Sequence, residues 1–152
     1  ILSLEIQRMP KDPSVEFGAT QHYPYLSVCT TSPHDMNPVR AWWEEDRALS
    51  QRFYNQVLGA WGEAPYYCEP WICKQIVEQH LTSPAMLTIL PLQDWLAMDG
   101  ELRRENPNDE RINVPANSRH YWRYRMHLSL EKLLSEQSFN ELVRSMIVRS
   151  GR

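Results

Sequence analysis

Three short segments carry side chains that could take part in chemistry. The first, Ser32-Pro33-His34-Asp35, directly follows a run of residues typical of a β-strand. Side chains at the carboxyl ends of strands face the ligand in α/β barrels, so His34 and Asp35 could contact a substrate. An aspartate in this position is also typical of a turn or of a helix cap, and the residues alone leave both interpretations open.

The second segment, Pro91-Leu92-Gln93-Asp94-Trp95, also follows a predicted strand. Its simpler interpretation is a tight turn in which Asp94 bonds the backbone and Trp95 packs against the body of the protein.

The third segment combines aromatic and basic residues. Arg111-Ile112-Asn113-Val114-Pro115 is followed by His120-Tyr121-Trp122-Arg123-Tyr124-Arg125. Interleaved rings and guanidinium groups suit single-stranded nucleic acid, which needs stacking platforms and cations. They suit sugars equally well, since rings stack on pyranose faces and Arg or Asn can bond hydroxyls. Packing of the segment against the body is a third option. The formal net charge of −3 disfavours nucleic acid and anionic membranes as partners.

The spacing of apolar residues, together with Pro, Gly and capping residues at the boundaries, predicts the strands and helices that position these segments. Strands are predicted at residues 2–7, 25–30 and 85–90. Leu2, Leu4 and Ile6 alternate with polar residues, as in a half-buried strand, whereas the nearly continuous apolar run 85–90 indicates a strand buried on both faces. The order of strands and helices predicts parallel strands with helical crossovers, in an α/β, helix-rich fold.

Helices are predicted between these strands and at the end of the chain. One should span 38–58, with Asn37 as its cap, and another 70–81, opened by Pro70 and closed by Pro84. A polar, irregular loop should cover 99–118. The terminal region should hold a helix from 126 to 134 and a second one that begins at the capping box of Ser138 and Glu141.

Bulk properties limit the class of protein. A length of 152 residues suits one domain, and 42 % hydrophobic with 23 % charged residues is globular. No apolar run reaches the roughly 20 residues that span a bilayer, and the first residues do not resemble a signal peptide. The chain starts without Met and inside a strand-like run, so we expect a piece of a larger protein. Cys29, Cys68 and Cys73 offer no metal-site spacing and predict reduced, partly buried thiols in a cytosolic protein.

Several blocks, in this order, resemble glycoside hydrolase family 77, the amylomaltases or disproportionating enzymes, in particular its plant cytosolic and bacterial members. These blocks are Leu4–Pro10, Tyr25–Asp35, Arg40–Asp46, Pro91–Asp94, Arg111–Pro115 and His120–Arg125. The likeness covers nearly the whole chain. Two departures concern local loop shape: Ala116 stands where glycine is common, and Met36-Asn37-Pro38 follows the His-Asp pair.

The resemblance implies a fold and a reaction. Residues 1–152 would be a single, incomplete domain, the C-terminal segment of a (β/α)8 catalytic barrel with about its last three strands. The parent would transfer α-1,4-glucan segments between maltooligosaccharides with retention, without a metal or organic cofactor, in the cytoplasm. The alternative is a non-catalytic carbohydrate-binding or protein-interaction module.

The resemblance also implies roles for particular residues. Asp35 would stabilise the transition state, His34 would bond the same sugar ring, and Asn113 would be a further substrate contact. The nucleophile and the acid/base would lie upstream of Ile1, so the chain alone should be inactive. Open strand edges and an uncovered inner sheet face predict that it binds its missing N-terminal part, self-associates or packs differently from the intact barrel.

Overall fold

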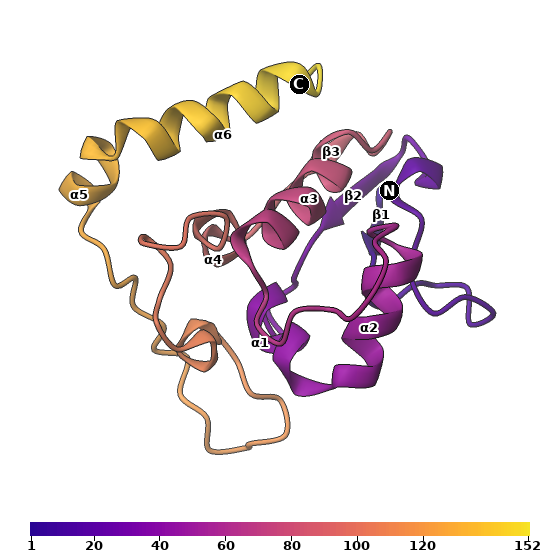
Figure 1. Ribbon diagram of the computed structural model, residues 1–152, viewed down its shortest axis with the longest axis horizontal. Helices are drawn as coiled ribbons and strands as arrows, with labels where there is room; N and C mark the ends of the chain where they lie inside the picture. The colour runs from indigo at the N-terminus through magenta and orange to yellow at the C-terminus, as the bar shows by residue number, and fades with distance from the viewer.

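The computed structural model describes residues 1–152 and contains one small parallel sheet with six helices (Figure 1). The strands are β1 (Ser3–Ile6), β2 (Ser27–Thr30) and β3 (Leu87–Thr88). The helices are α1 (Val39–Glu45), α2 (Arg47–Gln56), α3 (Pro70–Leu81), α4 (Leu92–Leu96), α5 (Leu130–Ser135) and α6 (Gln137–Arg149), with two 3₁₀ turns, η1 (Thr20–His22) and η2 (Pro107–Glu110). None of the helices combines the length and hydrophobicity needed to cross a membrane.

The sheet has the order β1-β2-β3, and both pairs of strands are parallel. Leu4 lies opposite Val28, which lies opposite Leu87. Parallel pairing is therefore confirmed, and each strand lies within its predicted range but is shorter. The connection from β1 to β2 holds only the short turn η1, whereas α1, α2 and α3 connect β2 to β3.

Only one face of the sheet is covered along its length. The Cys29 thiol on that face lies 3.7 Å from the His80 carbonyl and 3.5 Å from the Ser83 hydroxyl, so the C-terminal end of α3 packs there. Side chains alternate between faces, and the other face presents Leu4, 48 % exposed, and Leu87, 43 % exposed. Ile89, just after β3, is also exposed.

One expectation about strand burial is therefore wrong for this chain, because the run 85–90 is not buried on both faces. The half-buried strand expected for β1 holds in part. Ile6 is 7 % exposed, whereas Leu4, on the same side of the strand, is exposed.

The predicted helix 38–58 is in fact two helices. Asp46 adopts an extended conformation between α1 and α2, and its side chain accepts the Leu49 backbone N–H at 3.1 Å, which caps α2. Asn37 does not cap α1, because its amide donates to the Glu45 carboxylate. Gly59, with a φ of 66°, follows the end of α2 as expected.

The core lies among the helices. Helix α3 has the predicted limits, and all five apolar residues of its expected inner face are buried. They join one cluster with residues of α1, α2, α4 and α6. Trp43 and Phe53 are its largest fully buried members. The three cysteines are unpaired and fully buried, deeper than expected, with the thiols of Cys68 and Cys73 3.4 Å apart.

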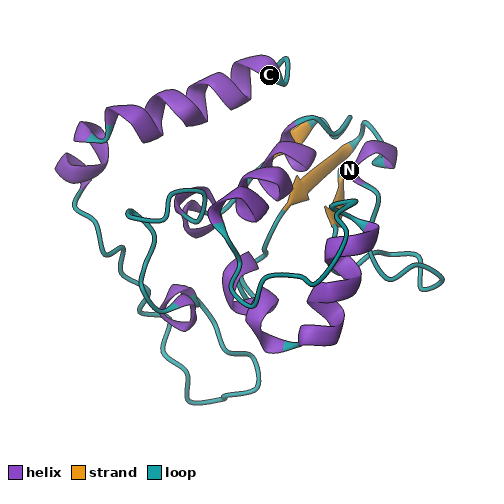
Figure 2. Ribbon diagram, viewed as in Figure 1, coloured by secondary structure: helices purple, strands orange, loops and turns teal.

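The C-terminal region departs from its predicted boundaries. Helix α5 begins at Leu130, four residues later than expected, because Ser129 caps it by accepting the Lys132 N–H at 3.1 Å. Ser138 lies inside α6 and makes no cap, so the predicted capping box is wrong. Figure 1 shows α6, in yellow, alongside α3, where Phe139 and Met146 enter the core. Figure 2 shows that the chain between α4 and α5 is mostly loop, interrupted by η2.

Candidate functional site

The candidate site is built on the loop that joins β2 to α1, residues 31–38, which carries His34 and Asp35. Asp94 in α4 holds this loop at both ends. One of its carboxylate oxygens accepts the hydroxyls of Thr31 at 2.5 Å and Ser32 at 2.6 Å. The other accepts the Val39 backbone N–H at 2.9 Å. Asp94 thus takes the place of a cap for α1, whose first amide would otherwise have no partner.

Arg8, just after β1, holds the same loop from the other side. Its guanidinium donates to the Thr31 carbonyl at 2.8 Å, the Ser32 hydroxyl at 2.6 Å and the Asn37 carbonyl at 2.9 Å. It also lies 5.0 Å over the ring of Trp42. Burial lowers the pKa of Arg8 to about 10, partly offset by the negative charge of Asp94. Arg8 therefore stays charged at neutral pH.

The structure places His34 and Asp35 at the exposed tip of this loop. The carboxylate of Asp35 makes no hydrogen bond within the chain, and α1 has no side-chain cap of its own, so Asp35 is not a capping residue. The other interpretation, a turn, is confirmed, because the Met36 N–H donates to the Pro33 carbonyl at 3.2 Å. His34 lies beside Trp122, with ring centroids 5.4 Å apart. His34 also lines a hollow of only about 10 Å³, together with Gln93 and Ile112. This chain alone forms no cleft of sugar size at that point.

Asn113 lies one residue beyond Ile112 and is half-buried. Its amide makes no hydrogen bond, and it does not line the hollow beside His34. The structure therefore brings the neighbour of Asn113 to His34, but not Asn113 itself.

A buried ion pair fixes the loop that leads to Asn113. Arg40 of α1 donates to the Glu110 carboxylate at 2.7 Å and to the Arg104 carbonyl at 2.7 Å. Gln93 donates to the Glu110 carbonyl at 3.2 Å. Burial raises the pKa of Glu110 to about 7, against the opposing effect of Arg40. The irregular loop predicted at 99–118 is thus anchored to α1 and α4 in its middle.

The aromatic and basic segment folds back onto this region. The His120 imidazole bonds the Ile112 carbonyl at 2.9 Å. Trp122 reaches His34 as described, so the first and third segments picked out from the sequence lie side by side.

The second segment is not the local turn expected for it. Asp94 lies in α4, and its carboxylate bonds residues that are 55 to 63 positions away in the sequence. The expected packing of Trp95 is confirmed, since it is half-buried against the core.

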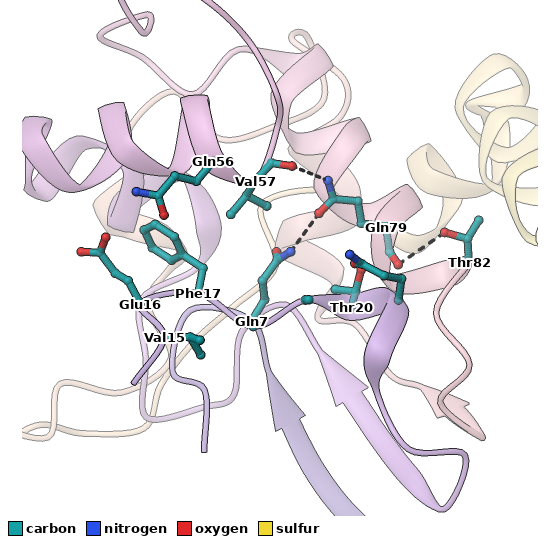
Figure 3. Close-up of a pocket in the computed structure, with 12 residues that line it drawn as sticks. Gln7, Val15, Glu16, Phe17, Thr20, Gln56, Val57, Gln79 and Thr82 are labelled. Carbon is teal, nitrogen blue, oxygen red and sulfur yellow. Dashed lines mark hydrogen bonds between the residues drawn. The ribbon is translucent and has the colours of Figure 1, made fainter. Parts of the chain in front are cut away.

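A larger hollow, about 580 Å³, lies elsewhere, between segment 15–21 and the C-terminal ends of α2 and α3 (Figure 3). Its polar walls are mostly amides. Gln7 donates to Gln79 at 2.8 Å, and Gln79 donates to the Val57 carbonyl at 3.1 Å. Neither His34 nor Asp35 reaches it, and its one carboxylate, Glu16, is bridged by Arg52 at 2.6 Å. It has no pair of carboxylates for acid–base chemistry.

Asp35 is the one carboxylate on the loop 31–38. Retaining glycosyl transfer needs a nucleophile and an acid/base with carboxyl groups about 5 Å apart. Asp94, the carboxylate that anchors the loop, is 1 % exposed and fully engaged in hydrogen bonds. A single free carboxylate can accept hydrogen bonds from a ligand, but it cannot supply both of these groups.

Comparison with known proteins identifies the class. The profile of glycoside hydrolase family 77, described as 4-alpha-glucanotransferase, matches residues 1–131. The 4-alpha-glucanotransferase DPE2 of Oryza sativa subsp. japonica is 41 % identical over 152 residues, which are 100 % of this chain and 16 % of that protein. A 4-alpha-glucanotransferase of Chlamydia muridarum is 32 % identical over 82 % of this chain and 23 % of its own length.

The fold agrees with this class. The amylomaltase from Streptococcus agalactiae, solved in complex with acarbose, superposes with a TM-score of 0.70 at 15 % identity. That match covers 99 % of this chain and 27 % of the solved one. The chain belongs to the 4-alpha-glucanotransferase family, glycoside hydrolase family 77. It spans only about a sixth to a quarter of the lengths of the relatives that it matches.

Sequence reasoning missed the residues that hold the site in place. Asp94 is buried and Arg8 half-buried, and their partners lie far away in the sequence. The sequence indicates a local turn for Asp94, and it marks Arg8 only as one residue of the block Leu4–Pro10. A buried charge implies a partner, but the sequence does not show which one.

Proposed function

We propose that this chain forms the closing part of the catalytic barrel of a retaining 4-α-glucanotransferase. Its three parallel strands would be about the last three of a (β/α)8 barrel, and residues 1–152 would be one incomplete domain. Family membership and the order β1-β2-β3 support this proposal. The apolar sheet face with Leu4 and Leu87 would be the barrel interior, covered by the other strands of the parent enzyme.

The observation that carries the proposal is the placement of Asp35. It is exposed on a loop at the carboxyl end of β2, and the charged side chains of Arg8 and Asp94 hold that loop through hydrogen bonds. A carboxylate that bonds ring hydroxyls strengthens its grip as the sugar approaches an oxocarbenium-like transition state. Such pre-organisation costs no rearrangement during the reaction.

His34 and Asn113 would complete the substrate contacts. His34 is exposed next to Asp35, with Trp122 against its ring to set its orientation, and it would bond the same sugar. Asn113 has an amide with no partner inside the chain and would bond a further hydroxyl. Both would need the remaining barrel to close a cleft around the ligand. The substrates would be maltooligosaccharides, with no organic cofactor or metal.

The complete product of the gene that encodes this chain provides the test. Incubated with maltotriose, it should release glucose and form longer maltooligosaccharides, which thin-layer chromatography resolves. The 152-residue chain alone should do neither. If the complete gene product binds maltotriose but does not redistribute its glucose units, the alternative, a carbohydrate-binding module, is supported instead.

A further inference from the structure

Four arginines gather around one hollow of about 360 Å³ between η2 and the segment 120–125. Arg104, Arg111, Arg123 and Arg125 line it, together with Tyr121 and Tyr124. These four are a quarter of the 16 basic residues in a chain whose net charge is −3. The acidic residue in the lining is Asp109.

Three of these guanidinium groups have no carboxylate partner. Arg111 pairs with Glu45 at 3.3 Å. By contrast, Arg104, Arg123 and Arg125 form no ion pair within 4 Å, although Asp109 lies in the same lining. The Nε of Arg104 is buried and has no hydrogen-bond partner at all. A buried donor without an acceptor is costly, and a ligand oxygen would relieve that cost.

Aromatic rings hold two of the guanidinium groups in fixed planes. Arg123 lies 4.7 Å over the ring of Tyr121, and Arg104 lies 5.4 Å over the ring of Tyr124. Arg104 also donates to the Arg125 carbonyl. Stacking restrains these long side chains, so less entropy would be lost when a ligand binds.

The charge of the hollow selects the ligand. Asp109 offsets the charge of one of the four arginines, and Glu45 offsets that of Arg111, so a net charge of +2 remains at the hollow. A phosphate monoester carries about −1.5 to −2 charge at pH 7 and three acceptor oxygens, which match guanidinium forks. We propose that this hollow binds the phosphate group of a phosphorylated sugar. A neutral glucan would leave the unpaired charges without a counter-charge.

The hollow lies next to the candidate site that carries His34 and Asp35. Ile112 lines both this hollow and the small one beside His34. A sugar phosphate would therefore bind next to the loop that carries Asp35. The inference stands on the arginines alone and holds whether or not Asp35 takes part in glucan transfer.

Titration calorimetry of the 152-residue protein tests the proposal with five probes: inorganic phosphate, glucose 6-phosphate, a maltooligosaccharide carrying one phosphate ester, glucose, and an oligothymidylate. Phosphate-bearing probes should bind and glucose should not. The substitutions R123Q and R125Q should each weaken binding about tenfold or more, since a charge-assisted contact is lost. R104Q should also weaken binding if the variant protein folds. If R104Q does not fold, R123Q and R125Q still test the proposal. The matched control R144Q, exposed on α6, should bind like the parent.

The two phosphate sources are distinguished by comparison. Stronger binding of the phosphorylated oligosaccharide than of glucose 6-phosphate would assign the site to esterified glucan, and the reverse would assign it to a free sugar phosphate. Equal affinity of R123Q and the parent would overturn the proposal. So would an absence of heat with every phosphate probe at millimolar concentration, or tighter binding of an oligothymidylate than of either sugar phosphate.

Discussion

Asp94→Asn is the sharpest perturbation of the loop that carries the candidate site. The substitution keeps the size of the side chain but removes the charge that accepts two hydroxyls and the Val39 amide. Hydrogen bonds to a charged group contribute about 1 kcal/mol more than neutral ones, so three of them amount to about 3 kcal/mol. In a protein of this size that lowers the midpoint of thermal unfolding by about 6–12 °C. Arg8 would also lose the negative charge of Asp94, which adds to the loss.

Urea unfolding followed by tryptophan fluorescence measures this change directly. The matched control is Asp35→Asn, only three residues from Ser32 but exposed and without a hydrogen bond. We expect the control to shift the free energy of unfolding by less than about 0.5 kcal/mol. A value for Asp94→Asn within that same range would refute the role of Asp94 as the anchor of the loop.

Three further predictions concern other parts of the molecule. Burial lowers the pKa of His80 to about 4, so protonation of the unfolded chain below about pH 6.5 opposes folding. Relative to a His80→Leu variant, the parent should lose about 1.4 kcal/mol of unfolding free energy per pH unit between pH 6.5 and 4. Parallel plots of unfolding free energy against pH for the two proteins would contradict this. All three thiols are at most 2 % exposed, so Ellman's reagent should report none in the native protein and three in urea, and rapid native reaction would show that the core opens. The uncovered sheet face should make the 152-residue protein self-associate in size-exclusion chromatography, and Leu87→Lys should reduce this, whereas a stable monomer of the parent would count against an uncovered barrel interior.

Much of the fold followed from local signals. Pro70 and Pro84 bracket α3 in the sequence, and the apolar spacing between them marks a face that is buried in the structure. The sequence does not indicate the break at Asp46, because the apolar stripe continues across it, although aspartate is a common helix cap. The burial of β3 was misjudged because an apolar run predicts a covered strand, and only the fold shows that nothing in the chain covers it.

The sequence indicates the candidate site residues, but not the residues that hold their loop in place. His34 and Asp35 stood out because of their residue types and their place after a strand, and the resemblance supplied their roles. Their catalytic roles and that of Asn113 stay predictions. The anchors Arg8 and Asp94 depend on contacts across 23 to 63 positions, which no local pattern encodes. The contact of Trp122 with His34 is of the same kind, since it arises from the return of a long loop.

The role of Asp35 is tested most directly in the complete gene product, by measuring turnover of maltotriose and its equilibrium binding for the parent and for Asp35→Asn. If this carboxylate tightens on the sugar mainly in the transition state, turnover should fall about a hundredfold or more, while the dissociation constant changes less than about tenfold. Unchanged turnover, or a loss of affinity as large as the loss of rate, would remove Asp35 from the catalytic site.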